Sequence, residues 1–305
     1  MLLILFFCGL LPFTLGFPWW DKAPVYSDEL ARTKMLPLAA AAYSNWPQEC
    51  LKNRFKDASL QHQVNVTCGP FGNNDICSGF TAVIHGDKAI VISFRGTDTF
   101  LQLLAEADYS AFHKKVPWIA GGYVSKYFYD GFMGLWNAGM GADFNALQTK
   151  YPSYKVWVTG HSLGAALASL AASYIVANNG VPPSNVQLVT FGQPRVGDML
   201  FAWAHNLQMS YSFRVTHYRD IVPHVPPELF EMYYHHKSEA FYLQSMAVGA
   251  NYTVCYADES LRCSDGLLDT TSIKDHLHYF EVDVSKYGKA GCNTPMDSTN
   301  SVLKV

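Results

Sequence analysis

The pentapeptide Gly-His-Ser-Leu-Gly at residues 160–164 constrains the fold of this chain more than any other feature. It follows an apolar, β-branched run at residues 155–159 and opens an alanine-rich, helix-favouring stretch at residues 164–177. A G-x-S-x-G sequence at such a junction is typical of a sharp strand-to-helix turn that presents the serine for reaction. Glycines two residues before and after the serine allow the tight backbone and a close helix–strand crossing. The sequence therefore predicts Ser162 to be a nucleophile in an α/β fold.

Short apolar runs and helical stretches alternate along the chain. The sequence predicts strands at residues 81–85, 88–94, 155–159, 186–191 and 213–218, and helices at residues 27–45, 131–150 and 164–177. The first two strands flank Gly86-Asp87 and are expected to form a hairpin. Buried strands that alternate with helices imply a mostly parallel sheet covered on both faces, which the hairpin makes mixed. Because there is no internal repeat or low-complexity linker, we expect a single domain over residues 17–305.

Residues 1–16 form an apolar opening that ends in Thr14-Leu15-Gly16. Small residues at its end are typical of a secretory signal peptide that is cleaved after Gly16. The opening is too short for a membrane-spanning helix, and no later apolar run reaches the length that such a helix needs. We therefore expect a secreted protein without a transmembrane segment.

The number of cysteines is consistent with an exported protein. Six follow the opening, at Cys50, Cys68, Cys77, Cys255, Cys263 and Cys292. An even number in an exported chain predicts disulfides, although counting leaves the pairing open. The spacings do not resemble those of zinc ligands, so we expect no metal and no other cofactor. Asn65 and Asn251 begin Asn-X-Thr sequons and are predicted to carry glycans.

The overall composition excludes some partners. The chain has 22 Lys and Arg against 25 Asp and Glu, and 49% of its residues are hydrophobic. It is too apolar for a disordered chain and too neutral to bind nucleic acid by bulk charge. We expect a monomer.

A serine nucleophile needs an imidazole to accept its proton and a carboxylate to orient that imidazole. After a G-x-S-x-G turn the chain order is serine, acid, histidine. Asp220 is favoured as the acid because it closely follows the predicted strand at residues 213–218, at its carboxyl end. The alternatives lie in loops that we expect to be solvated, at Asp198, Asp258, Asp265 and Asp269. Position alone leaves several histidines open as the base, namely His217, His224, His235, His236, His276 and His278. His161 is interpreted as structural.

Five motifs in a fixed order carry a resemblance to a known family. They are FRGT at residues 94–97, GHSLG at 160–164, TFGQPRVG at 190–197, RDIVP at 219–223 and DHLHY at 275–279. Together they resemble the class 3 lipase family, the fungal-type triacylglycerol lipases, over residues 82–279. The resemblance implies an α/β-hydrolase fold and a serine hydrolase of lipid esters that works through an acyl-enzyme. It also implies Ser162 as nucleophile, Asp220 as orienting acid and His276 as base.

The resemblance extends to features around this triad. An oxyanion needs N–H donors aimed at it, and these are expected to be the backbone N–H of Leu163 and, by the family pattern, that of Thr97. The disulfides that the resemblance implies are Cys50–Cys292, Cys68–Cys77 and Cys255–Cys263.

Two departures from the family pattern leave the substrate open. The segment at residues 98–108, a lid in the lipases, lacks tryptophan here, carries three acidic residues and is also similar to the corresponding loop of feruloyl esterases. The V-H-x-G-F motif appears as FYDGF at residues 128–132, without its histidine. A triacylglycerol lipase is favoured, with a phospholipase A or a feruloyl esterase as alternatives. A non-catalytic lipid-binding relative is disfavoured by the intact triad. Phe100, Leu101 and Leu104 either line an acyl site or belong to the core.

Overall fold

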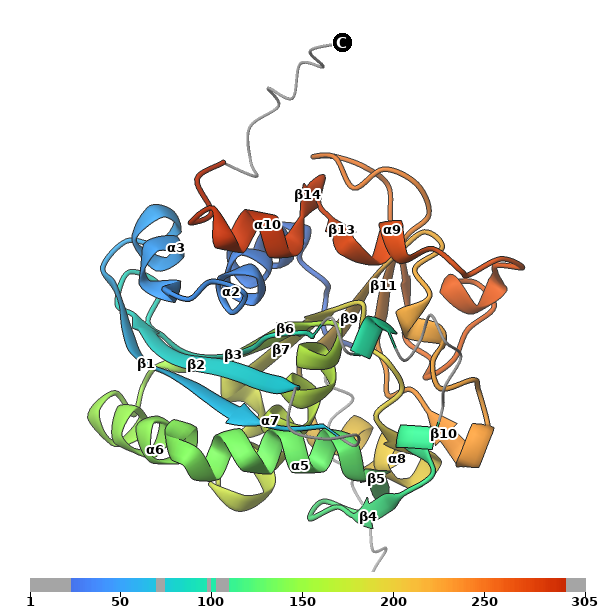
Figure 1. Ribbon diagram of the computed structural model, residues 1–305, viewed down its shortest axis with the longest axis horizontal. Helices are drawn as coiled ribbons and strands as arrows, with labels where there is room; N and C mark the ends of the chain where they lie inside the picture. Colours follow the sequence, from blue (N-terminus) through green and yellow to red (C-terminus); the bar gives the residue numbers. More distant parts are fainter. Residues whose placement is uncertain (1–22, 70–74, 98–99, 103–109, 295–305) are drawn as a thin grey trace, which may run out of the picture.

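A mixed eight-stranded sheet forms the centre of the computed structural model, which describes residues 23–69, 75–97, 100–102 and 110–294 (Figure 1). The strand order is β1-β2-β3-β6-β7-β9-β11-β12. The strands are β1 (Ala58–Thr67), β2 (Ile76–Ile84), β3 (Ala89–Phe94), β6 (Lys155–His161), β7 (Val186–Phe191), β9 (Ser212–His217), β11 (Glu239–Tyr242) and β12 (Thr253–Cys255). Neighbours from β3 to β11 pair in parallel, and the pairs at both edges are antiparallel. The predicted mixed, mostly parallel sheet is therefore confirmed.

The predicted strands are present with small shifts, and some strands were not predicted. The hairpin around Gly86-Asp87 is formed by β2 and β3, with β2 starting earlier than expected at Ile76. β1 was missed because its sequence, ASLQHQVNVT, is largely polar, and it lies half exposed at the edge of the sheet. An edge strand needs only one apolar face, so a search for apolar runs does not find it.

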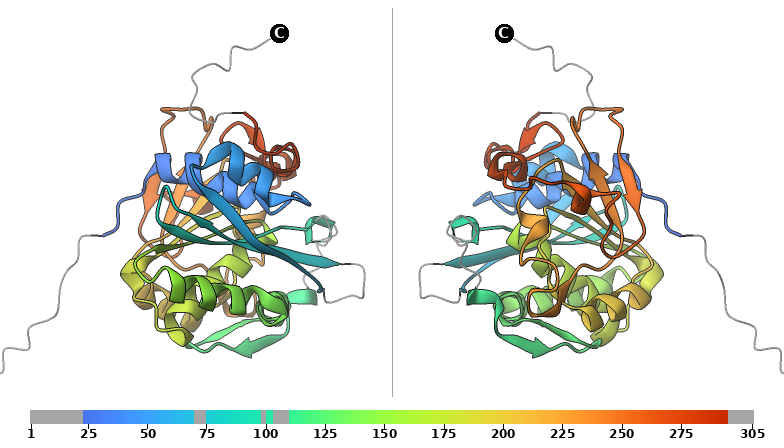
Figure 2. Two further views of the ribbon diagram at one scale, coloured as in Figure 1. Left: turned by 90° about the vertical axis from the view of Figure 1, so that its left-hand side faces the viewer. Right: turned by 90° about the vertical axis from the view of Figure 1, so that its right-hand side faces the viewer.

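Helices cover both faces of the sheet (Figures 1 and 2). One face carries α2 (Leu36–Ala41), α3 (Pro47–Arg54) and α10 (Val284–Lys289), and the other carries α5 (Lys126–Leu135), α6 (Gly141–Lys150), α7 (Leu163–Asn178) and α8 (Met199–Gln208). The helix expected at residues 27–45 begins as α1 (Asp28–Leu30), passes through a π-helical turn and ends with α2 at Ala41. The helix expected at residues 131–150 begins earlier, at Lys126, and also contains a π-helical turn, at Trp136–Met140.

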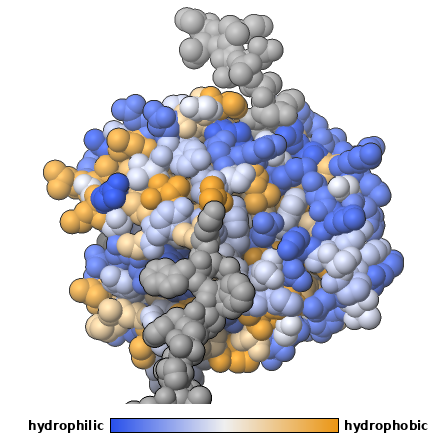
Figure 3. All heavy atoms as spheres, turned by 180° about the vertical axis from the view of Figure 1, so that it is seen from behind, coloured by the Kyte–Doolittle hydropathy of each residue, from blue (hydrophilic) through white to orange (hydrophobic). Residues whose placement is uncertain are grey.

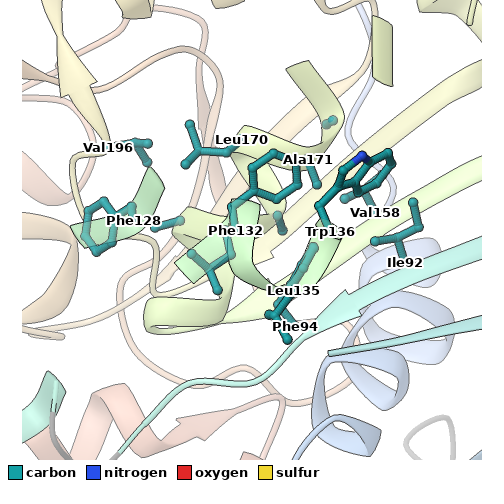
Figure 4. Close-up of a cluster of buried hydrophobic side chains, with 14 of the residues drawn as sticks. Ile92, Phe94, Phe128, Phe132, Leu135, Trp136, Val158, Leu170, Ala171 and Val196 are labelled. Carbon is teal, nitrogen blue, oxygen red and sulfur yellow. The ribbon is translucent and has the colours of Figure 1, made fainter. Parts of the chain in front are cut away.

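Each face of the sheet has its own apolar core. Beneath α5 and α7, Phe132 and Trp136 belong to the same cluster as Ile92, Phe94 and Val158 from β3 and β6 (Figure 4). Five alanines of α7 are fully buried, namely Ala165, Ala166, Ala168, Ala171 and Ala172. Their small side chains let the helix lie close to the strands, which fixes the position of the residues at its N-terminus.

Smaller elements surround the carboxyl ends of the central strands. A four-stranded sheet has the order β10-β8-β5-β4, with β4 at Lys115–Pro117, β5 at Tyr123–Ser125, β8 at Gly197–Asp198 and β10 at Tyr233–Tyr234. The short helix α9 (Ile273–Leu277) leads into the strand pair β13 (His278–Tyr279) and β14 (Val282–Asp283). Three disulfides join the pairs that the resemblance implied, Cys50–Cys292, Cys68–Cys77 and Cys255–Cys263.

The surface is mixed rather than dominated by one kind of side chain. Seen from behind the view of Figure 1, polar residues make up most of the surface, and apolar residues form small groups among them (Figure 3). Exposed apolar side chains include Leu200, Trp203 and Leu207 on α8. Within the described ranges, no helix has both the length and the apolar composition needed to cross a bilayer. The expected signal peptide at residues 1–16 lies outside these ranges.

Candidate active site

Ser162 lies in the turn between β6 and α7, in a strained conformation. Its φ is 62° and its ψ is −131°, a region that residues other than glycine rarely adopt. The flanking glycines make this turn possible. A Cβ on Gly160 would lie 2.2 Å from the carbonyl oxygen of Gly164, and a Cβ on Gly164 would lie 2.3 Å from that of Phe94. The close crossing of α7 and β6 therefore leaves no room for a side chain at Gly160 or Gly164, as the sequence predicted.

His276 and Asp220 meet near this turn, although 56 residues separate them in the sequence. His276 Nδ1 lies 3.0 Å from both carboxylate oxygens of Asp220. A carboxylate only accepts hydrogen bonds, so Nδ1 carries the hydrogen and Nε2 is the basic nitrogen. His276 comes from α9, and Asp220 lies three residues after the end of β9, where it bridges to Ser272 just before α9. This bridge holds the two segments together.

Asp220 is kept ionised by its partners. Tyr279 Oη donates to Oδ2 at 2.6 Å, and the N–H of Val222 donates to Oδ1 at 2.8 Å. Burial alone would raise the pKa of Asp220, but the nearby His276 and the hydrogen bonds from His276, Tyr279 and Val222 hold that pKa below its usual value. Gly192 leaves room for the pair, because a Cβ there would lie 2.8 Å from Asp220 Oδ2 and from His276 Nδ1.

Two polar atoms at this site are buried without a partner. Among the described residues, neither Ser162 Oγ nor His276 Nε2 forms a hydrogen bond, although the side chains are at most 1% exposed. Leaving buried polar atoms unpaired costs free energy, and such atoms in a native structure call for an explanation. A hydroxyl and a basic nitrogen held apart from other partners have the chemistry of a nucleophile and its base.

The two residues expected to bind an oxyanion flank Ser162. Leu163 is the first residue of α7, so its N–H has no acceptor within the helix. Thr97 is 9% exposed, and its Oγ1 accepts a hydrogen bond from the N–H of Phe100 at 3.1 Å. Gly96 packs directly on the nucleophile, since a Cβ there would lie 2.8 Å from Ser162 Cβ. The loop that carries Thr97 is thus in contact with the serine turn.

The other aspartates that the sequence left open have partners elsewhere. Asp265 lies 3.4 Å from the buried guanidinium of Arg195, and only 12% of its side chain is exposed. The expectation that this aspartate lies in a solvated loop is therefore wrong. The remaining three cap a helix or bind a neighbouring polar group: Asp198 at the start of α8, Asp258 with Asn206 and Asp269 with Arg219.

The other candidate histidines also have different environments. His217 Nδ1 faces the carbonyl oxygens of Asp275 and His278, and His278 Nδ1 faces that of Lys274. Burial lowers the pKa values of His224, His235 and His236, the last two well below the usual value. In the described part of the chain none of these five contacts Asp220 through a hydrogen bond, so His276 alone among the six candidates has the geometry of an oriented base.

Sequence reasoning missed two tyrosines at this site. Tyr279 lies in the DHLHY motif without an assigned role, and its hydroxyl binds Asp220. Tyr43 lies far upstream, and its hydroxyl is 2.7 Å from His161 Nδ1. Nothing in the local sequence marks Tyr43, because the contact spans 118 residues. His161 bonds to Tyr43 and to the backbone of His276, in agreement with its interpretation as structural.

Little of the expected lid is described. Of its candidate acyl-site residues, Phe100 is fully buried and packs against Phe112, Tyr127 and Phe128, which favours the core alternative. Leu101 is partly buried against the same core, and Leu104 lies outside the described residues. In the described ranges, no cluster of three or more His, Cys, Asp or Glu side chains is placed to bind a metal ion.

The proteins that are similar to this chain in sequence include several lipases. A family model described as lipase (class 3) matches residues 91–230. A lipase of Caenorhabditis elegans is 35% identical over 304 residues, which cover 89% of this chain and 84% of that protein. A lipase of Rhizomucor miehei is 36% identical over 66% of this chain and 55% of its own length. A secreted mono- and diacylglycerol lipase of Fusarium solani is 30% identical over 80% of this chain and 73% of that protein.

Solved structures show the same fold. A triacylglycerol lipase whose catalytic centre is described as a serine protease triad superposes with a TM-score of 0.72 at 30% identity, covering 86% of this chain and 97% of that one. Lipase II of Rhizopus niveus superposes with a TM-score of 0.72 at 28% identity, covering the same shares of the two chains. The fold described above is therefore the α/β-hydrolase fold of these fungal lipases.

Proposed function

This chain belongs to the class 3 lipase family, and from that premise we propose that it is a secreted enzyme that hydrolyses lipid esters through an acyl-enzyme on Ser162. Membership makes it a serine hydrolase of carboxylic esters that acts on lipids. The roles of individual residues, the exact ester and the route of export are the proposal.

One observation carries the assignment of roles. His276 Nδ1 is bonded to both oxygens of Asp220, while His276 Nε2 and Ser162 Oγ are buried and have no partner among the described residues. This arrangement sets the tautomer of His276 so that its basic nitrogen is free to accept a proton. Apo enzymes often hold such pairs at distances that shorten only when substrate binds.

In the first half of the reaction, Ser162 Oγ attacks the carbonyl carbon of the ester while its proton passes to His276 Nε2. The N–H groups of Thr97 and Leu163 stabilise the negative charge that develops on the carbonyl oxygen. Asp220 stabilises the imidazolium that forms and does not take the proton itself. When the tetrahedral intermediate collapses, His276 gives the proton to the leaving alcohol, and the acyl group remains on Ser162.

In the second half, water replaces the alcohol. His276 Nε2 accepts a proton from water, the hydroxide attacks the acyl carbon, and the same two N–H groups hold the oxyanion. The proton then returns to Ser162 Oγ, and the fatty acid leaves. Every step uses proton transfer and nucleophilic attack alone, so the residues described are sufficient for hydrolysis.

The test compares Ser162→Ala with Ser184→Ala, a matched control at an exposed serine. We expect Ser162→Ala to lose ester hydrolysis and labelling by a fluorophosphonate probe, while Ser184→Ala keeps both. Hydrolysis by Ser162→Ala at the wild-type rate would refute the proposed mechanism. A correctly folded wild-type protein that fails to label would instead indicate a non-catalytic lipid-binding relative.

The proposed substrate is an acylglycerol. Two groups of similar proteins support this class, one named for triacylglycerols and the other for mono- and diacylglycerols. A panel of triacylglycerol, diacylglycerol, phosphatidylcholine and feruloyl ester separates the alternatives. Acylglycerols should give the highest kcat/KM, whereas preference for phosphatidylcholine or the feruloyl ester would make the enzyme a phospholipase A or a feruloyl esterase.

Export is supported by features of the mature chain. Three disulfides are formed, and Asn65 and Asn251 of the two sequons are exposed. Disulfides persist in oxidising compartments, and similar proteins from Fusarium and Penicillium are named as secreted. We expect the protein recovered from culture medium to begin at Phe17, to form one domain over residues 17–305 and to lose mass on glycosidase treatment. N-terminal sequencing that begins at Met1 would contradict cleavage.

A further inference from the structure

His161, the residue before the serine, joins two distant segments at the site. Its Nδ1 is 2.7 Å from the hydroxyl of Tyr43, and its Nε2 is 2.8 Å from the backbone carbonyl oxygen of His276. His161 ends β6, Tyr43 follows α2, and His276 lies in α9. The side chain therefore connects the serine turn with the helix that carries the base.

The carbonyl of His276 needs a donor from outside its own helix. α9 has only five residues, Ile273–Leu277, and the last carbonyls of a helix have no partner within it. His161 supplies that donor. Because a carbonyl only accepts, Nε2 of His161 must carry the hydrogen, and in neutral imidazole Nδ1 is then the acceptor for the hydroxyl of Tyr43. The direction of both hydrogen bonds is thereby set.

The same histidine lies flat against the catalytic ring. The ring centroids of His161 and His276 are 4.5 Å apart, and the planes differ by 23°. Burial, and then the proximity of His276, lower the pKa of His161 to about 3. A neutral His161 is required here, because an imidazolium stacked on His276 would repel the charge that His276 gains when it accepts a proton.

Tyr43 also contacts the loop expected to bind the oxyanion. A Cβ on Gly96 would lie 2.3 Å from the hydroxyl of Tyr43 and 2.9 Å from the backbone oxygen of His161. The hydroxyl thus lies between the Gly96 backbone and the His161 ring. A shift of Tyr43 would be transmitted both to the oxyanion loop and to α9.

We propose that Tyr43 and His161 are positioning residues that hold His276 and the oxyanion loop in register with Ser162. Tyr43 orients the ring of His161, and His161 fixes the C-terminal turn of α9 through the carbonyl of His276. This inference rests on the proposed catalytic roles of Ser162 and His276. It adds to the triad a residue from the N-terminal segment, outside residues 91–230 that the family model matches.

Tyr43→Phe removes only the hydroxyl, and the chain offers a matched control. The hydroxyl of Tyr154 is 2.9 Å from Nδ1 of His85, in a pair near the start of β6, at the opposite end of that strand from Ser162. We expect Tyr43→Phe to lower kcat by about 10-fold with KM nearly unchanged, because a small displacement of catalytic groups is costly. Tyr154→Phe should keep the wild-type kcat. Active-site titration with a fluorophosphonate normalises kcat to correctly folded protein, so a loss of stability alone leaves it unchanged.

Two replacements of His161 test the donor directly. His161→Leu removes the hydrogen bond to the His276 carbonyl and should lower kcat per titrated site by roughly 10- to 100-fold. His161→Gln keeps an N–H donor without a titratable group and should restore most of this loss. Equal losses of kcat in His161→Leu and His161→Gln would overturn the positioning role, and so would a wild-type kcat in both Tyr43→Phe and His161→Leu.

Ser162→Ala is measured in parallel to separate this inference from the proposed function. Activity in Ser162→Ala would refute the proposed function itself. An inactive Ser162→Ala together with wild-type kcat in the Tyr43 and His161 variants would refute only this inference.

Discussion

The imidazole of His276 is held by Asp220 through two equivalent contacts, with Nδ1 3.0 Å from each carboxylate oxygen. Both side chains are essentially inaccessible to solvent. Burial of an ionised carboxylate is tolerated because each oxygen has a further donor, the backbone N–H of Val222 for Oδ1 and the hydroxyl of Tyr279 for Oδ2. These hydrogen bonds fix the orientation of the carboxylate and keep the hydrogen of His276 on Nδ1.

Asp220→Asn should favour the unreactive tautomer of His276 while keeping the shape of the site. The carboxamide can turn its NH₂ group toward Nδ1, which would place the hydrogen of His276 on Nε2 and stop it from accepting the proton of Ser162. We expect kcat to fall by about 10³- to 10⁴-fold with KM nearly unchanged. Steady-state kinetics on a soluble short-chain ester measure this directly. A loss of less than about tenfold would mean that Asp220 does not orient the base.

Gly96→Ala replaces no triad residue and should disturb the oxyanion loop. The new Cβ would lie 2.3 Å from the Tyr43 hydroxyl and 2.8 Å from Ser162 Cβ, so the loop that carries Thr97 must move. Losing one oxyanion donor costs about 10²- to 10³-fold in kcat, and we expect a decrease of that order. Gly134→Ala is the control: it lies within α5, and its Cβ would make an ordinary 3.4 Å contact with Val66. This control should keep full activity, and an active Gly96→Ala enzyme would argue against Thr97 as a donor.

The central part of the fold was predictable because its strands are buried on both faces. β3, β6, β7 and β9 are rich in apolar residues and buried over nearly all of their length, and the glycines at 160 and 164 mark the point where β6 and α7 cross. The strands toward the two sides of the sheet were less predictable. β1 is long enough to be recognised, but it is largely polar and half exposed. β11 is buried, but its four residues are too few to form a recognisable apolar run.

The site was predictable only in part from the residues themselves. Ser162 and Asp220 follow from their places at strand ends, whereas position alone did not separate His276 from five other histidines. That choice came from the resemblance. Tyr43 was not predictable from local sequence, because it is one of 18 tyrosines and reaches the site only through a contact across 118 residues. Side chains that support a site through tertiary packing leave no local pattern.

The disulfides should differ in their contribution to stability. Cys50–Cys292 closes a loop of 242 residues, and Cys68–Cys77 closes one of 9. On a chain-entropy model the first contributes about 5 kcal/mol to the free energy of unfolding and the second about half as much. Replacing both cysteines of each pair by alanine should therefore lower the urea midpoint more for Cys50–Cys292. Equal midpoints for the two double variants would show that loop length does not govern their contributions.

Acid should destabilise the fold through its buried histidines. Burial lowers the pKa of His205 to about 3, with a further contribution from nearby Arg214, and it lowers the pKa of His161 to about the same value. In the unfolded chain both histidines titrate near pH 6.5. Stability from their neutral burial is therefore complete above about pH 6.5 and is lost as the pH falls toward 3, because the unfolded state binds more protons. The free energy of unfolding from urea titrations should decrease by about 1.4 kcal/mol per pH unit for each such histidine.

His205→Leu isolates one of these groups away from the site. The ring of His205 stacks on that of His236 at 3.7 Å, and neither of its nitrogens has a partner among the described residues. Leucine fills the space without titrating, so the variant should be at least as stable as wild type at pH 5. The decrease of its unfolding free energy with falling pH should be smaller than in wild type by the contribution of one histidine, about 1.4 kcal/mol per pH unit. Activity at pH 7 should be unchanged, because His205 does not contact the triad. An unchanged slope would show that His205 is already protonated in the native protein, which would contradict its neutral burial.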